Sequence, residues 1–93
     1  MTKLTDAQVA ERMAGAPEWR GAEGSIEREW KFADFAAAVA FVNRVAELAE
    51  SANHHPDILL HGWNRVRLTL STHSEGGLTD ADFRLAGAID AGA

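Results

Sequence analysis

The sequence predicts an α+β domain in which a four-stranded antiparallel sheet carries three helices on one face. Two kinds of apolar pattern support this prediction. Three segments repeat apolar residues with a helical period, and the others alternate apolar and polar residues as half-buried strands do. The segments follow the order α-β-β-α-β-β-α, in which neighbouring strands form hairpins. A chain of 93 residues can bury one core, so residues 1–93 are expected to form a single domain.

The first helix is expected over residues 6–14. Thr5 and Gln8 have the spacing of a capping box, in which each side chain bonds the backbone amide of the other residue. Gly15 and Pro17 follow the last helical residue, and both favour a helix end at this point.

Residues 19–22 and 26–32 are predicted to form a hairpin around a turn at Glu23 and Gly24. In the second strand, one face carries Ile26, Arg28, Trp30 and Phe32, and the other carries Glu27, Glu29 and Lys31. One mostly apolar face and one charged face are typical of a sheet that is covered on a single side.

A long helix is expected from an N-cap at Asp34 to about Ala52. Its apolar residues form two adjoining stripes: Phe35, Val39, Val42, Ala46 and Ala49 in one, and Phe41, Val45, Leu48 and Ala52 in the other. The second stripe exceeds what packing on one sheet requires, which favours self-association of the chain. Alternatively, the alanines are present only because alanine is the best helix former.

The second pair of strands is predicted at residues 58–60 and 65–71, and Gly76 and Gly77 end the strand pattern. A last helix is expected to begin at Thr79. Its inward-facing residues are predicted to be Phe83, Ala86 and Ile89.

All four histidines fall within residues 54–73, and this concentration suggests proton-transfer chemistry. His54 and His55 precede Pro56, which pushes the residue before it out of the helical region, so the pair is expected at a helix end. His73 follows the strongest strand and is expected in a loop. Surface histidines are common, however, and an adjacent pair alone would carry little weight.

Other site chemistries find weaker support. Adjacent His54 and His55 cannot easily converge on one metal ion, and the metal-binding patterns His-x-His and His-Glu-x-x-His are absent. The chain contains no cysteine, and no serine lies in a Gly-x-Ser-x-Gly nucleophile elbow. No metal is therefore expected, and acid-base catalysis by imidazole remains.

Charge and hydropathy argue against two classes of partner. The formal net charge is −5 and the basic residues are scattered, so no nucleic-acid partner is expected. The longest apolar run, residues 35–42, is far shorter than the roughly 20 residues of a membrane span. No signal peptide is recognisable, and the absence of cysteine is compatible with a reducing compartment, so we expect a cytoplasmic protein without a membrane partner.

A set of spaced residues resembles the signature of the pterin-4a-carbinolamine dehydratases, and the likeness extends from about Trp19 to Asp90. The matching residues are Glu50, His54, His55, Pro56, Trp63, His73 and Asp82. The resemblance implies a small α+β subunit that forms dimers or tetramers and holds no metal or prosthetic group. It implies dehydration of 4a-hydroxytetrahydropterin to quinonoid dihydropterin, which recycles the pterin cofactor of aromatic amino acid hydroxylases.

By the same resemblance, His54 and His73 would be the acid and the base, in either order, and His55 would help to hold the ring. The expected substrate-binding residues are Glu50, Asn53, Pro56, Trp63, Thr72, Ser74, Glu75 and Asp82.

Several of these residues have plainer explanations. Glu50 could be a solvated charge, or it could tune the imidazole of His54, four residues later. Asp82 could only stabilise the start of the last helix. Trp63 is expected to be a wall of the site or core filling. Asn53 stands where some members of the family carry aspartate, and Trp63 where tyrosine is frequent, so fine substrate contacts could differ. The alternative function is a non-catalytic dimerisation or assembly cofactor of a larger protein.

Overall fold

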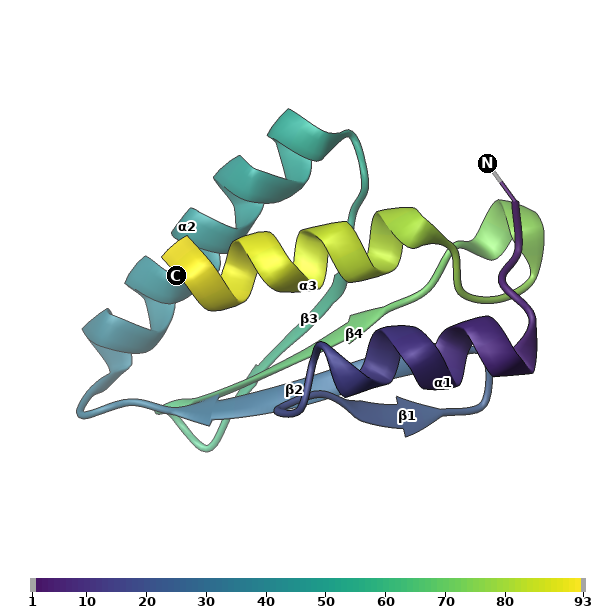
Figure 1. Ribbon diagram of the computed structural model, residues 1–93. Coiled ribbons are helices and arrows are strands. Elements are labelled where there is room, and N and C mark those ends of the chain that lie inside the picture. Colours follow the sequence, from purple (N-terminus) through teal and green to yellow (C-terminus); the bar gives the residue numbers. More distant parts are fainter. Residues whose placement is uncertain (1, 93) are drawn as a thin grey trace.

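A computed structural model describes residues 2–92 of the chain (Figure 1). In chain order its elements are α1 (Asp6–Ala14), β1 (Arg20–Ala22), β2 (Ser25–Lys31), α2 (Phe35–Ala52), β3 (Asp57–His61), β4 (Arg65–Leu70), the 3₁₀ turn η1 (His73–Glu75) and α3 (Asp80–Gly92).

The four strands form one antiparallel sheet in the spatial order β1-β2-β4-β3. Figure 1 shows α1, α2 and α3 on the same face of this sheet. The predicted α+β fold, its element order and its single layer of helices are therefore confirmed. The first strand begins at Arg20 rather than at residue 19, because the Trp19 amide donates to the carbonyl of Ala16 in the turn after α1 and not to a neighbouring strand. The Trp19 side chain is buried, and its indole N–H donates to Asp90.

Local signals set the start of the first two helices. In the capping box of α1, the Gln8 amide donates to the Thr5 hydroxyl at 3.2 Å, and the Thr5 amide donates to Gln8 Oε1 at 2.9 Å. At the start of α2, the amide of Ala37 donates to Asp34 Oδ1 at 2.7 Å. Both predicted caps are confirmed, because a cap depends on residues only three positions apart.

The core lies between the sheet and the helices. Its fully buried side chains are Ile26, Val66, Leu68 and Leu70 from the sheet, Ala38 and Val45 from α2, and Ala86 and Ile89 from α3. In α3 the innermost stripe follows the 3.6-residue period through Asp82, Leu85 and Ile89, so Phe83 lies at its border and is only half-buried. The prediction of Ala86 and Ile89 as inward residues is confirmed, whereas that of Phe83 is correct only in part.

One stripe of α2 is buried, and Val42 and Leu48 beside it are partly buried and pack against the same core. The buried residues are Ala38, Phe41, Val45 and Ala49, which combine members of both predicted stripes with one further alanine. Phe35 is 55% exposed, and Ala46 and Ala52 also face solvent. Self-association through the remaining apolar surface stays a prediction.

The strand register brings two distant segments together. Asp57 at the start of β3 pairs with Thr69 near the end of β4. The residues that follow α2 therefore lie beside those that follow β4.

Candidate functional site

The end of α2 turns the chain so that His54 leaves the helix. Asn53 adopts the left-handed conformation, with φ 49° and ψ 43°, and the amide of His54 donates to the carbonyl of Ala49 at 3.0 Å. Both features are typical of a helix end of the Schellman type. Pro56 follows directly, and β3 begins one residue later. The predicted position of His54 and His55 at a helix end is confirmed.

The left-handed conformation of Asn53 leads to a stability prediction. Asn53→Val is expected to lower the free energy of unfolding by about 1 kcal/mol, because a β-branched side chain is strained at positive φ. Asn53→Gly should be neutral or slightly stabilising, because glycine adopts this conformation without strain. Urea unfolding of both variants measures the difference. Equal losses would show that the contacts of the Asn53 side chain matter more than its backbone conformation.

The imidazole of His54 contacts a buried carboxylate. His54 Nε2 lies 2.5 Å from Asp82 Oδ1, and the two side chains are 11% and 0% exposed. Asp82 stands in the first turn of α3, 28 positions further along the chain. It is fully buried inside the fold, so it does more than place a negative charge near a solvated helix terminus.

Two threonines complete the surroundings of Asp82. Its Oδ2 accepts from the Thr72 hydroxyl at 2.8 Å and from the Thr79 amide at 3.0 Å. The two threonine hydroxyl oxygens are 2.9 Å apart. Thr79 is predicted from the sequence as a helix start but not as a residue of the site. The three-residue spacing of Thr79 and Asp82, which is that of a capping box, could have revealed this second role. The cluster of His54, Asp82, Thr72 and Thr79 therefore joins the ends of α2 and β4 to the start of α3.

Glu50 pairs with His55 and not with His54. His55 Nε2 contacts Glu50 Oε2, and both side chains are largely exposed. An exposed pair of this kind contributes little to stability. The structure thus gives no hydrogen bond through which Glu50 would tune His54, and contact of Glu50 or His55 with a ligand stays a prediction.

His73 lies in the η1 turn, at the edge of a shallow hollow of about 410 Å³. Thr69 and Ser71 line the same hollow, and they alternate with the buried Leu68 and Leu70, so the hollow opens on the face of the sheet without helices. Ser74 and Glu75 belong to the same turn. Among residues 2–92 no hydrogen bond joins His73 to His54. The two are linked only indirectly, because Thr72, next to His73, bonds the carboxylate that holds His54.

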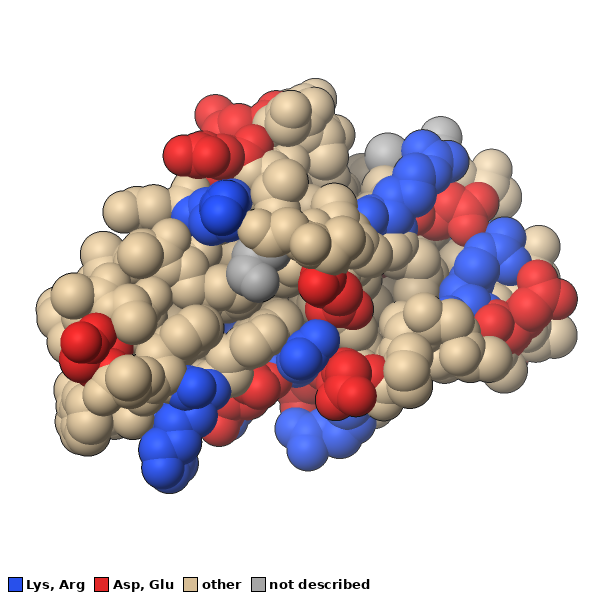
Figure 2. All heavy atoms as spheres, turned by 60° about the vertical axis from the view of Figure 1, so that its left-hand side comes forward, with Lys and Arg blue, Asp and Glu red and all other residues tan. Residues whose placement is uncertain are grey.

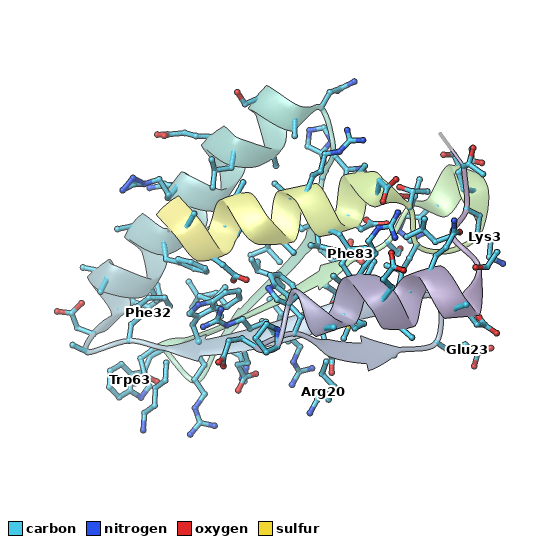
Figure 3. All side chains as sticks on the ribbon, in the orientation of Figure 1. Lys3, Arg20, Glu23, Phe32, Trp63 and Phe83 are labelled. Atoms are coloured by element: carbon cyan, nitrogen blue, oxygen red, sulfur yellow. The ribbon has the colours of Figure 1, made fainter. Side chains whose placement is uncertain are left out.

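Within one subunit, Trp63 does not lie at the cluster formed by His54, Asp82, Thr72 and Thr79. It lies in the turn between β3 and β4 with φ 59°, and 61% of the residue is exposed. Figure 3 shows it at the end of the molecule opposite Glu23, which lines the same hollow as His73. The five residues of β3, at about 3.4 Å each, separate this turn from Pro56. A role of Trp63 in the site stays a prediction.

The fourth histidine, His61, has a separate structural partner. His61 Nε2 lies 2.9 Å from Glu29 Oε1 on the solvated face of the sheet. This hydrogen bond is the main cause that lowers the pKa of Glu29 from its ordinary value, with the charges of His61 and Arg67 acting in the same direction against partial desolvation. His61 therefore pairs with a residue of β2 and not with the other histidines.

On the face shown in Figure 2, basic and acidic side chains are intermingled, so this face carries no extended patch of a single charge. None of the helices in residues 2–92 combines the length and the hydropathy that a bilayer span needs.

Comparison with known proteins supports a single family. The family model described as pterin 4 alpha carbinolamine dehydratase matches residues 2–92. A protein of Chloroflexus aurantiacus is 52% identical over 90 residues, which cover 97% of this chain and 96% of the relative. A protein of Acidobacterium capsulatum is 53% identical over 91 residues, 98% of each chain. Both bear the name "Putative pterin-4-alpha-carbinolamine dehydratase".

Two solved structures share the fold. A crystal structure described as a transcriptional coactivator/pterin dehydratase from Brucella melitensis superposes with a TM-score of 0.90 at 35% identity, over 97% of both chains. A pterin dehydratase-like protein described as a RuBisCO assembly factor of the alpha-carboxysome superposes with a TM-score of 0.64 at 27% identity, over 78% of this chain and 83% of the other.

Proposed function

The chain belongs to the pterin-4a-carbinolamine dehydratase family, and on this premise we propose that it dehydrates 4a-hydroxytetrahydropterin to quinonoid dihydropterin. The product can be reduced and reused, so the reaction would recycle the pterin cofactor of aromatic amino acid hydroxylases in the cytoplasm. The observation that supports catalysis most directly is the imidazole of His54, held by the buried Asp82 at the edge of the fold.

The reaction needs two proton transfers and no net change in protons. The bond between C4a and the hydroxyl oxygen breaks as that oxygen receives a proton and leaves as water. The proton on N5 is removed, and its electron pair forms the double bond between C4a and N5. Each transfer by a positioned group contributes typically about 10²- to 10⁴-fold. Imidazoles suit both steps because they exchange protons near neutral pH.

In this proposal His54 supplies one proton-transfer group and His73 the other, while His55 holds the ring. Further polar groups lie next to these histidines in the sequence: Asn53 precedes His54, and Ser74 and Glu75 follow His73. Thr72 precedes His73, and its buried hydroxyl donates to Asp82. Glu50 and Pro56 flank the histidine pair. Trp63 would contribute a wall of the site. In this proposal no metal and no resident cofactor take part, and the pterin is itself the substrate.

The decisive experiment follows absorbance when the purified protein meets freshly generated 4a-hydroxytetrahydropterin. Acceleration of water loss over buffer at micromolar protein is expected. Treatment with a chelator should leave the rate unchanged. No acceleration over buffer would refute the enzyme, and loss of activity with chelator that metal restores would instead indicate a metal-dependent hydrolase.

A second candidate function is a non-catalytic one, as a dimerisation or assembly cofactor of a larger protein. It is favoured by the likeness to the solved structure of a pterin dehydratase-like protein described as a RuBisCO assembly factor. Under either function we propose a homodimer or homotetramer, for which the exposed apolar surface of α2 provides area. Light scattering after size exclusion measures the oligomer, and an inactive oligomer would favour the second candidate.

A further inference from the structure

We infer that His54 exchanges protons through its Nδ1 atom. Hydrogen bonds that all point from Thr79 through Thr72 to Asp82 keep the Asp82 carboxylate as an acceptor. This acceptor holds the hydrogen of the neutral His54 ring on Nε2. The inference deepens the proposed function, and it rests on that function for its catalytic meaning. Asp82, Thr72 and Thr79 act in it as positioning residues, since none of them needs to touch the substrate.

This series of hydrogen bonds ends on the carboxylate of Asp82. The Thr79 backbone amide, 3.0 Å from Asp82 Oδ2, can only donate. An ionised carboxylate can only accept, so the Thr72 hydroxyl, 2.8 Å from the same oxygen, must direct its single proton there. Both threonines are buried, with exposures of 5% and 0%, so water does not compete for these bonds.

The direction of the remaining contact follows from proton counting. Thr72 has spent its proton on Asp82, so in its 2.9 Å contact with Thr79 the Thr72 oxygen must accept and the Thr79 hydroxyl must donate. The amide of Ala81 in turn donates to the Thr79 oxygen at 3.3 Å. The hydroxyl protons of Thr79 and Thr72 therefore both point toward Asp82, and neither hydroxyl can donate elsewhere.

The consequence for His54 is a single tautomer. Asp82 Oδ1 is an acceptor at 2.5 Å from His54 Nε2, so Nε2 must carry the hydrogen. A neutral imidazole with its hydrogen on Nε2 has its lone pair on Nδ1.

Nδ1 is also the accessible nitrogen. Nδ1 of His54 has no hydrogen-bond partner among residues 2–92. In the same range, every side-chain nitrogen or oxygen that is shut off from solvent, in a buried or half-buried residue, does have a partner. Since the His54 side chain is 11% exposed, Nδ1 must lie on the part of the ring that solvent reaches. The reactive lone pair and the open side of the ring therefore coincide.

Nitrogen NMR of the histidine rings tests the tautomer without any substrate. The test uses long-range ¹⁵N–¹H correlation spectra, recorded at a pH where the ring shifts themselves report a neutral His54. We expect the hydrogen on Nε2 in the unmodified protein. A ring with its hydrogen on Nδ1 would overturn the inference, whatever any variant does.

Asp82→Asn is the sharpest variant. The amide oxygen is expected to take the position of Oδ2, where two donors converge, so its NH₂ group faces His54 Nε2 and forces that nitrogen to accept. The hydrogen then moves to Nδ1, and dehydration should slow by about 10²- to 10⁴-fold, as when a catalytic histidine is held in the wrong tautomer. The matched variant Thr79→Val leaves Asp82 as an acceptor and should keep the hydrogen on Nε2. An Asp82→Asn protein that folds, retains Nε2–H and keeps its rate would contradict the inference.

The readouts separate the two proposals. A protein with Nε2–H but without dehydratase activity would refute the proposed function and leave the tautomer assignment standing. An active protein with Nδ1–H would refute only the assignment to Nδ1.

Discussion

His54→Ala is expected to slow the dehydration of 4a-hydroxytetrahydropterin by about 10²- to 10⁴-fold, the usual contribution of one positioned acid or base. The variant removes the imidazole that Asp82 holds and leaves nothing that can exchange a proton at that position. His73→Ala should cause a loss in the same range, because the second proton transfer then falls to water. Stopped-flow absorbance at saturating substrate measures both variants as changes in kcat.

A loss of fold must be separated from a loss of chemistry. His54→Ala leaves Asp82 Oδ1 buried without a partner, which costs about 1–3 kcal/mol of stability. His54→Gln keeps a side-chain N–H for Asp82 but cannot act as acid or base, so it should be as slow as the alanine variant while unfolding closer to the unmodified protein. Circular dichroism on heating reports the fold of each.

His61→Ala is the matched control for histidine removal. His61 pairs with Glu29 on the solvated face of the sheet and lies outside the motif, so kcat should change by no more than a few-fold. A drop as large as that of His54→Ala would contradict the assignment of the site. Full activity of His54→Ala, in a folded protein, would do so as well.

Leu68→Ala is expected to lower the free energy of unfolding by about 2–5 kcal/mol. Leu68 is completely buried in β4, which lies between β2 and β3, and its removal leaves a cavity between the sheet and the helices. Domains of this size are stable by only about 5–15 kcal/mol, so the loss is a large share of the total. Urea unfolding followed by tryptophan fluorescence measures it.

Leu59→Ala provides the control for this variant. It is the same chemical change in the same sheet, but Leu59 lies on the edge strand β3 and is 47% exposed. Its loss should be well below that of Leu68→Ala at protein concentrations where the chain is a monomer. Equal losses in the monomer would mean that the core does not lie where the burial of β4 places it.

The helices and strands were predictable because their signals are short-range. The capping box of α1 and the Asp34 cap of α2 involve residues three positions apart, and the alternation of Val66, Leu68 and Leu70 needs only the two-residue period of a strand. The sequence shows two apolar stripes on α2, and this pattern does not indicate which of them packs inward. The sheet and α3 bury Phe41, Val45 and Ala49 and leave Phe35 in solvent, and this choice depends on how α2 lies against both.

By itself the sequence determined the α+β order, the position of His54 and His55 at a helix end, and the motif that suggests a pterin dehydratase. Only the tertiary structure decided that Asp82 holds His54 and that Thr72 and Thr79 orient that carboxylate. The physical reason is distance along the chain: His54 and Asp82 are 28 positions apart, and they meet because β3 and β4 pair with Asp57 beside Thr69. Local patterns specify elements, whereas the register between elements specifies which side chains meet.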